Sequence, residues 1–211
     1  MLGAVASGFQ NTGTGEVTIE RFIPANRAFR LLSTAVNTST TIRDNWQEGV
    51  NNSGTDFTQD NLNPNPGYGT HITGSTTGAN GFDASISGNP SLFGFDNMSG
   101  SWEDIENTDV NTLTAGTPYR LFVRGSRATD LSDNSSTPTA TILRTTGQLV
   151  TGNVTTDVSN DAGAFNLVGN PYQSSVDMNT LIANSNNIND GYYYIFDPNI
   201  GEQGAYVTIL L

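Results

Sequence analysis

Four small residue types dominate this chain, since Asn, Thr, Ser and Gly together make up about 94 of its 211 residues. Glycine and asparagine supply the positive-φ positions of turns, and threonine favours strands. The composition therefore predicts short strands joined by long, elaborate loops. The 10 Phe, 7 Tyr and 2 Trp residues are too many for a disordered polar chain, so we expect this β-structure to be ordered.

Side chains that perform chemistry are scarce. The chain has one histidine, His71, no cysteine and no lysine, so all eight of its basic residues are arginines. Because nucleophiles and general bases have so few sources, we expect no catalytic residues, no cofactor and no enzymatic activity. A lone histidine is more often a loop or sheet residue satisfied by hydrogen bonds than a base, and we expect this of His71.

Acidic pairs leave one enzymatic alternative open. Glu103 with Asp104, or Asp56 with Asp60, could serve a glycosidase, which needs two carboxyl groups that face each other across a cleft. Spacing in the sequence does not establish such a pair, and the acidic residues are spread along the chain without a focus.

The formal net charge is −12. A chain this negative repels phosphate backbones and anionic membrane surfaces, and no stripe of arginine offsets the repulsion. We therefore expect no nucleic-acid binding. No stretch approaches 18 consecutive apolar residues, so we expect no membrane insertion either.

Runs of strand length recur along the chain, and the clearest is 119–124. Two segments favour helix instead: 176–183, which has helical spacing after Asp177, and 42–50, where Trp46 anchors either one helical turn or a loop. We expect an all-β fold, an antiparallel β-sandwich with long loops and one or two short helices. Residues 1–15 would form an N-terminal extension and residues 16–211 a single domain. The other predicted strands are 16–22, 28–36, 70–73, 82–86, 165–168, 192–196 and 205–211, with a hairpin of 140–143 and 148–151 around Thr146 and Gly147.

The final predicted strand, 205–211, is apolar on both of its alternating faces. This pattern is typical of a strand covered on both sides, so we expect it to be an integral part of the sandwich. Self-association of two copies through an unprotected sheet edge is the alternative.

Five segments occur in an order that resembles a known family: IPANRAFR (23–30), NWQEG (45–49), YRLFVRG (119–125), LVGNPY (167–172) and YIFDPN (194–199). Together they resemble a region of large secreted or surface proteins of Bacteroidetes, especially flavobacteria, exported by the type IX secretion system. In those proteins this region lies upstream of a C-terminal sorting domain. The resemblance implies a secreted or cell-surface, extracellular protein, and it carries no catalytic residues to transfer.

Arginines and aromatic residues supply the candidate ligand-binding positions. Guanidinium groups pair carboxylates bidentately, so a cluster of arginines could bind an acidic polysaccharide. Arg120 and Arg124 fall on one face of the same predicted strand, and ion pairing with nearby acidic residues is the alternative. Aromatic rings could stack on sugar faces, or they could form small cores that pin the long loops. The residues concerned are Arg27, Arg30, Arg120, Arg124 and Arg127 among the arginines, and Tyr68, Phe82, Phe93, Phe95 and Trp102 among the aromatic residues.

Two oxygen-rich loops are candidate calcium sites. One contains Asp197, Asn199 and Glu202, and the other contains Asp130 and Asp133. Calcium binds flexible loops of this kind, although neither has the twelve-residue frame of an EF-hand. Side-chain capping of turns is the alternative.

These observations give two hypotheses for function. The first is a non-enzymatic structural or adhesive module that acts in adhesion or extracellular assembly, with an extracellular polysaccharide or other surface proteins as partners. The second is a carbohydrate-binding module or a fragment of a glycan-active enzyme. An exposed aromatic strip, or a cleft with facing carboxylates, would favour the second.

Overall fold

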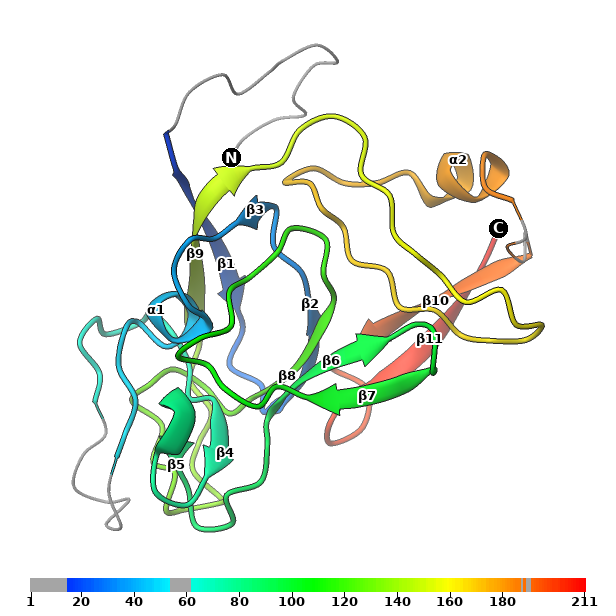
Figure 1. Cartoon of the computed structure of the whole chain (residues 1–211). Coiled ribbons are helices and arrows are strands. Elements are labelled where there is room, and N and C mark those ends of the chain that lie inside the picture. Colours follow the sequence, from blue (N-terminus) through cyan, green and yellow to red (C-terminus); the bar gives the residue numbers. More distant parts are fainter. Residues whose placement is uncertain (1–14, 54–61, 187, 189–190) are drawn as a thin grey trace.

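The computed structural model describes residues 15–53, 62–186, 188 and 191–211 (Figure 1). Within these residues the chain is mostly antiparallel β-structure. It has two short α-helices, α1 (Ile42–Trp46) and α2 (Met178–Ala183), and a short 3-10 helix, η1 (Ala79–Gly81). The predicted β-rich class with one or two short helices is confirmed. The predicted N-terminal extension lies outside the described residues except for Gly15.

The first sheet has the strand order β1-β9-β3, with bounds Val17–Ile23, Thr141–Leu149 and Val36–Asn37. β9 is one continuous strand, so the predicted hairpin around Thr146 and Gly147 is wrong. Gly147 reads as a turn residue in the sequence, but here it allows a close backbone approach. A Cβ atom at Gly147 would lie 2.2 Å from the backbone oxygen of Asn37, and glycine within a strand often marks such an approach.

Replacing Gly147 with alanine is therefore expected to lower the free energy of unfolding by about 1–3 kcal/mol, the usual cost of overpacking. Gly94 is a matched control, because it also lies in a strand and its added Cβ would have its nearest neighbour at 3.8 Å. Urea unfolding of both variants checks this. Equal stability of the two variants would show that the pairing of β3 with β9 does not require a glycine at position 147.

The second sheet has the order β2-β8-β6-β7, with bounds Ala28–Leu32, Tyr119–Val123, Leu92–Asp96 and Ser101–Asp104. The predicted strand 28–36 divides between the two sheets, since β2 ends at Leu32 and β3 begins at Val36. In β2 and β8 buried residues alternate with half-buried ones. One face of this sheet therefore belongs to the core, and the other is partly open.

Both sheets contribute side chains to one core. Leu143 of the first sheet belongs to the same buried cluster as Leu121 and Val123 of the second. Helix α1 adds Trp46, whose ring packs edge-on against Tyr119 with centroids 5.5 Å apart. A capping box starts this helix, because Thr41 and Asp44 bind each other's backbone N–H groups. Of the two alternatives for residues 42–50, a helical turn or a loop, the structure has the short helix.

The predicted strands 70–73 and 82–86 are reduced to a short parallel pair, β4 (Thr73–Ser75) and β5 (Asp83–Ala84). Most of the order in this region comes from side chains rather than from strand pairing. Asn51, for example, donates hydrogen bonds to the backbone oxygens of Gly78 and Phe82. The long polar segment is therefore held by its own asparagine and aspartate contacts.

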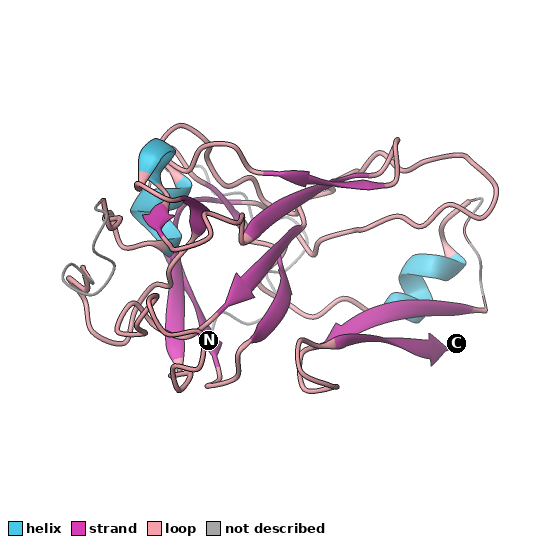
Figure 2. Cartoon of the chain, turned by 90° about the horizontal axis from the view of Figure 1, so that it is seen from below, coloured by secondary structure: helices cyan, strands magenta, loops and turns pink. Residues whose placement is uncertain are grey.

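The C-terminal segment ends in a hairpin of β10 (Tyr192–Asp197) and β11 (Ala205–Leu210), which lies beside α2 at one end of the molecule (Figure 2). The predicted positions of these strands and of the helix are confirmed, whereas residues 165–168 form no strand. The expectation that β11 is covered on both faces is wrong. Half-buried and exposed residues alternate along it, and Leu210 is 78% exposed.

Candidate ligand-binding face

The partly open face of the second sheet brings together five of the predicted ligand-binding residues. Arg120 of β8 is the direct partner of Phe93 on β6, and Trp102 of β7 is the partner of Phe95. Arg124 follows β8 and shares the face of Arg120, because successive side chains of a strand alternate between faces. We call this set the arginine–aromatic face, and its members are Phe29, Phe93, Phe95, Trp102, Arg120, Phe122 and Arg124.

Arg120 lies at the centre of this face. Its guanidinium carbon is 4.0 Å from the ring centroid of Trp102, 4.6 Å from that of Phe93 and 5.0 Å from that of Phe29. These distances are within the range of cation–π attraction, and rings on several sides fix the position of the guanidinium. The rings also contact one another, with the centroids of Phe95 and Trp102 5.0 Å apart.

A second group of cations lies beside the first. The guanidinium carbons of Arg124 and Arg27 are 5.1 Å and 5.6 Å from the same ring centroid, that of Phe122. Burial lowers the pKa of Arg124 to about 10, and the charge of Arg27 adds to this effect, while Asp83 opposes it. Asp104, the strand partner of Phe93, supplies one carboxylate near Arg120 and opposes the lowering of that arginine's pKa by burial. The arginines Arg27, Arg120 and Arg124 therefore outnumber the carboxylate at this face of a chain whose net charge is −12.

Two donor atoms on this face have no hydrogen-bond partner among the described residues. They are Nε of Arg120 and Nη1 of Arg124, and both are shielded from solvent. A buried donor without a partner costs free energy, and the cost is larger for a charged group. Because solvent does not reach these two atoms, an anion would pair with the accessible part of the two half-buried side chains.

Other predicted arginine and aromatic positions lie elsewhere. Arg30 is buried on the opposite face of the sheet, where it donates to the backbone oxygens of Asn26 and Phe29. Arg144 stacks on Tyr68, with its guanidinium carbon 4.4 Å from the ring centroid, and forms an ion pair with Glu48. Tyr68 is therefore separate from the arginine–aromatic face.

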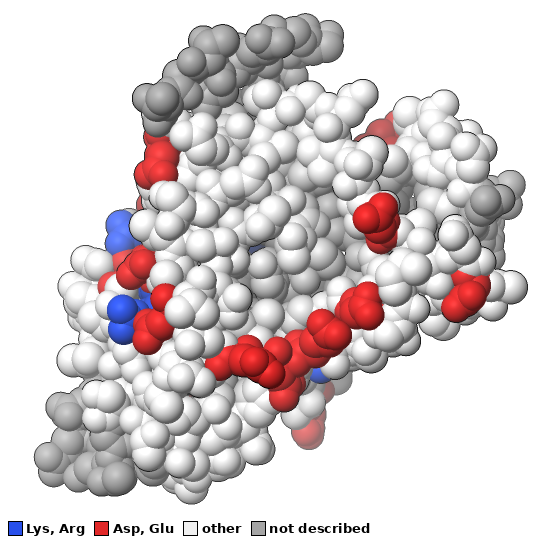
Figure 3. All heavy atoms as spheres, viewed as in Figure 1, with Lys and Arg blue, Asp and Glu red and all other residues white. Residues whose placement is uncertain are grey.

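Of the carboxylate pairs proposed for a glycosidase, the pair that the structure describes does not face across a cleft. Glu103 and Asp104 are neighbours in β7, so their side chains point to opposite sides of the sheet. Acidic side chains form a row over the part of the surface that carries β6 and β7 (Figure 3). Charges on an edge strand such as β7 oppose pairing with another chain. Asp56 and Asp60 lie outside the described residues.

The candidate calcium loops are closed by their own turn contacts. Oδ1 of Asp130 accepts hydrogen bonds from the backbone N–H and the hydroxyl of Ser132, and these bonds lower the pKa of Asp130. Oδ1 of Asp133 accepts from the backbone of Ser135, and Oδ1 of Asp197 accepts from the backbone of Asn199. Glu202 is exposed. These contacts fit the turn-capping alternative, and within the described residues no three His, Asp or Glu side chains gather as a metal site.

A buried network around Asp83 could not be recognised in the sequence. Arg127 donates to both carboxylate oxygens of Asp83, at 3.0 Å and 2.8 Å, and Nδ1 of His71 lies 3.3 Å from Oδ1. Gln47 and the backbone N–H groups of Asn52 and Ile72 complete the contacts. Burial alone would raise the pKa of Asp83, but His71 and Arg127 outweigh it and hold that pKa well below the usual range.

This network is structural in character. Asp83 and Arg127 are fully buried and His71 is 1% exposed, so no substrate reaches them. Nε2 of His71 lies 3.0 Å from the backbone oxygen of Arg127, a position from which it can donate. The ring is thus held by neighbouring groups, as expected for a lone histidine.

The chain matches no protein-family model, no curated protein and no solved structure. No helix in the described part of the chain is long and apolar enough to cross a membrane.

Proposed function

We propose that this chain is a non-enzymatic adhesive module that binds an acidic extracellular polysaccharide on its arginine–aromatic face. The observation that carries the proposal is the half-buried guanidinium of Arg120, which the rings of Phe29, Phe93 and Trp102 hold in one position. Uronic-acid sugars offer both groups that such a site needs. Their carboxylates accept from guanidinium groups, and their C–H faces stack on aromatic rings.

The wider setting of the proposal is a secreted or cell-surface bacterial protein, built as an antiparallel β-sandwich from the two main sheets. The ordered motifs that resemble proteins exported by type IX secretion support this location. The scarcity of nucleophiles and bases supports a binding role over catalysis. The proposal combines the two initial hypotheses, because the module would adhere by binding a carbohydrate.

The test is binding of polygalacturonate, with neutral dextran as the comparison polymer. Wild-type protein is expected to bind the uronate polymer only, and Arg120→Gln is expected to weaken binding about tenfold or more. A hydrogen bond to a charged group contributes about 1.5–3 kcal/mol, and 1.4 kcal/mol corresponds to a factor of ten in affinity. Isothermal titration calorimetry measures both variants.

Arg144→Gln is the matched control. Arg144 also stacks on an aromatic ring, but its guanidinium is already paired with Glu48, so its loss should leave the affinity unchanged. An equal loss in both variants would indicate attraction by overall charge instead of a site. Absence of binding by the wild-type protein would reject the proposal.

A further inference from the structure

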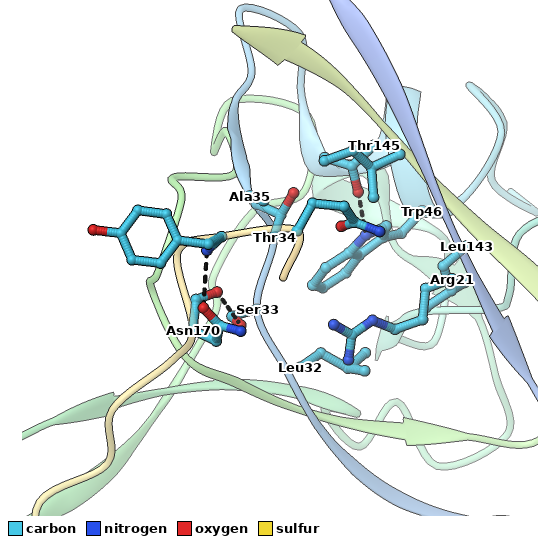
Figure 4. A pocket seen from close by; sticks show the side chains of 12 residues that line it. Arg21, Leu32, Ser33, Thr34, Ala35, Trp46, Leu143, Thr145 and Asn170 are labelled. Carbon is cyan, nitrogen blue, oxygen red and sulfur yellow. Dashed lines mark hydrogen bonds between the residues drawn. The ribbon is translucent and has the colours of Figure 1, made fainter. Parts of the chain in front are cut away.

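A small cavity opens where the first sheet meets the segment between β2 and β3. Its lining includes Leu143 and Thr145 of β9, Trp46 of α1, and Asn170 from the C-terminal segment (Figure 4). The cavity volume is about 20 Å³. A volume of this size holds about one water molecule or one ion of similar dimensions.

Arg21 of β1 reaches into this cavity, between Trp46 and Leu32 (Figure 4). All eight arginines lie in the described residues, and Arg21 alone among them has a side chain with no hydrogen bond, ion pair or aromatic ring contact to another described residue. Arg21 is exposed to solvent, and the protein that surrounds part of its side chain lowers its pKa by desolvation. The cavity therefore contains a cation whose charge nothing in the described protein balances.

The lining adds donors and no carboxylate. Oγ1 of Thr145 accepts a hydrogen bond from Nε1 of Trp46 at 3.1 Å, so its own hydrogen is free to point into the cavity. The Gln173 side chain, also in the lining, makes no hydrogen bond with the described residues. Arg21, Thr145 and Gln173 can thus all donate to one species in the cavity.

We propose that this cavity binds a single monovalent anion of halide size, such as chloride. A water molecule would also fit the volume, but only an anion would both accept hydrogen bonds from the Arg21 guanidinium and balance its charge. A polyatomic anion such as gluconate carries the same charge but is too large for the space. This site lies on the core side of the first sheet and is separate from the arginine–aromatic face.

Chloride-35 NMR line broadening tests the proposal on the full chain. Wild-type protein is expected to broaden the chloride signal in a saturable way, and bromide should reverse the broadening while gluconate at the same concentration should not. Arg21→Gln should lose this halide-selective component. Arg43→Gln is the control, because Arg43 already pairs with Asp109 at 2.8 Å, and it should behave as wild type. Unchanged broadening in Arg21→Gln, or equal competition by gluconate, would overturn the proposal.

A second measurement needs no variant. Crystals of the wild-type protein grown in sodium bromide are expected to give an anomalous peak within hydrogen-bond distance of the Arg21 guanidinium. Bromide peaks only at other arginines, or none at all, would show that the cavity holds water.

Discussion

Replacing Asp83 with asparagine is expected to lower the free energy of unfolding by about 3–5 kcal/mol, the usual cost of breaking a buried ion pair. Asp83 accepts hydrogen bonds from Arg127, Gln47 and two backbone N–H groups. An asparagine NH₂ group would turn one of its two acceptor oxygens into a donor that faces other donors. The charge of Arg127, which is fully buried, would then lack its partner.

Urea unfolding at neutral pH measures this loss, with Asp104→Asn as the matched control. Asp104 is exposed on β7, and a surface substitution of this kind usually changes stability by less than about 0.5 kcal/mol. Similar stabilities of the two variants would mean that the Asp83 network contributes little to the fold.

The same network predicts how stability changes with acidity. The pKa of Asp83 in the folded protein is lowered, so its contribution is fully present above the ordinary aspartate pKa of about 3.9. It is lost as the pH falls below that value toward the folded-state pKa. The difference in stability between wild type and Asp83→Asn should therefore be constant from neutral pH down to about pH 5 and shrink below about pH 4.

Truncating Trp46 to alanine is the second large effect, with an expected loss of about 3–5 kcal/mol. Trp46 is 2% exposed, packs against Tyr119 and donates its indole N–H to Thr145. Its removal leaves a cavity between the two sheets and removes the contacts of α1 with Tyr119 and Thr145. Thermal and urea unfolding of the variant measure the loss.

Phe165→Ala is the control for this truncation. Phe165 is 68% exposed, although it contacts Tyr194, so the same kind of deletion should cost less than about 1 kcal/mol there. A Trp46 variant as stable as the Phe165 variant would place the main core elsewhere than between the sheets.

The sequence predicted elements whose signals are local. The alternation of residues 119–124 placed Arg120 and Arg124 on one side of a strand. The role of Gly147 was misread because a strand glycine that permits close approach has the same local signature as a turn glycine. Only the position of Asn37, far away in the sequence, distinguishes the two.

The candidate site was predictable only in part for the same reason. The sequence indicated Arg120 and Trp102 separately, but the contact between them depends on β6, which lies between their strands. The pairing of Asp83 with Arg127 and His71 had no signal in the sequence, because no spacing rule connects the segments that carry them. Strand alternation does place Arg30 opposite Arg27, but which of the two faces is buried depends on the packing of the whole fold, and it is the face of Arg30.

The pairing of β1 with β9 has a consequence for the speed of folding. The hydroxyls of Thr18 and Thr146, which meet across these strands, are 128 residues apart in the chain. Contacts between distant segments form slowly, because a long loop must close before any stabilisation is gained. During synthesis β1 emerges early and has to wait for β9, and its apolar residues remain uncovered for that time. We therefore expect slow refolding in which β1 pairs late. Because chains with an uncovered β1 can aggregate, the refolding yield should fall as the protein concentration rises.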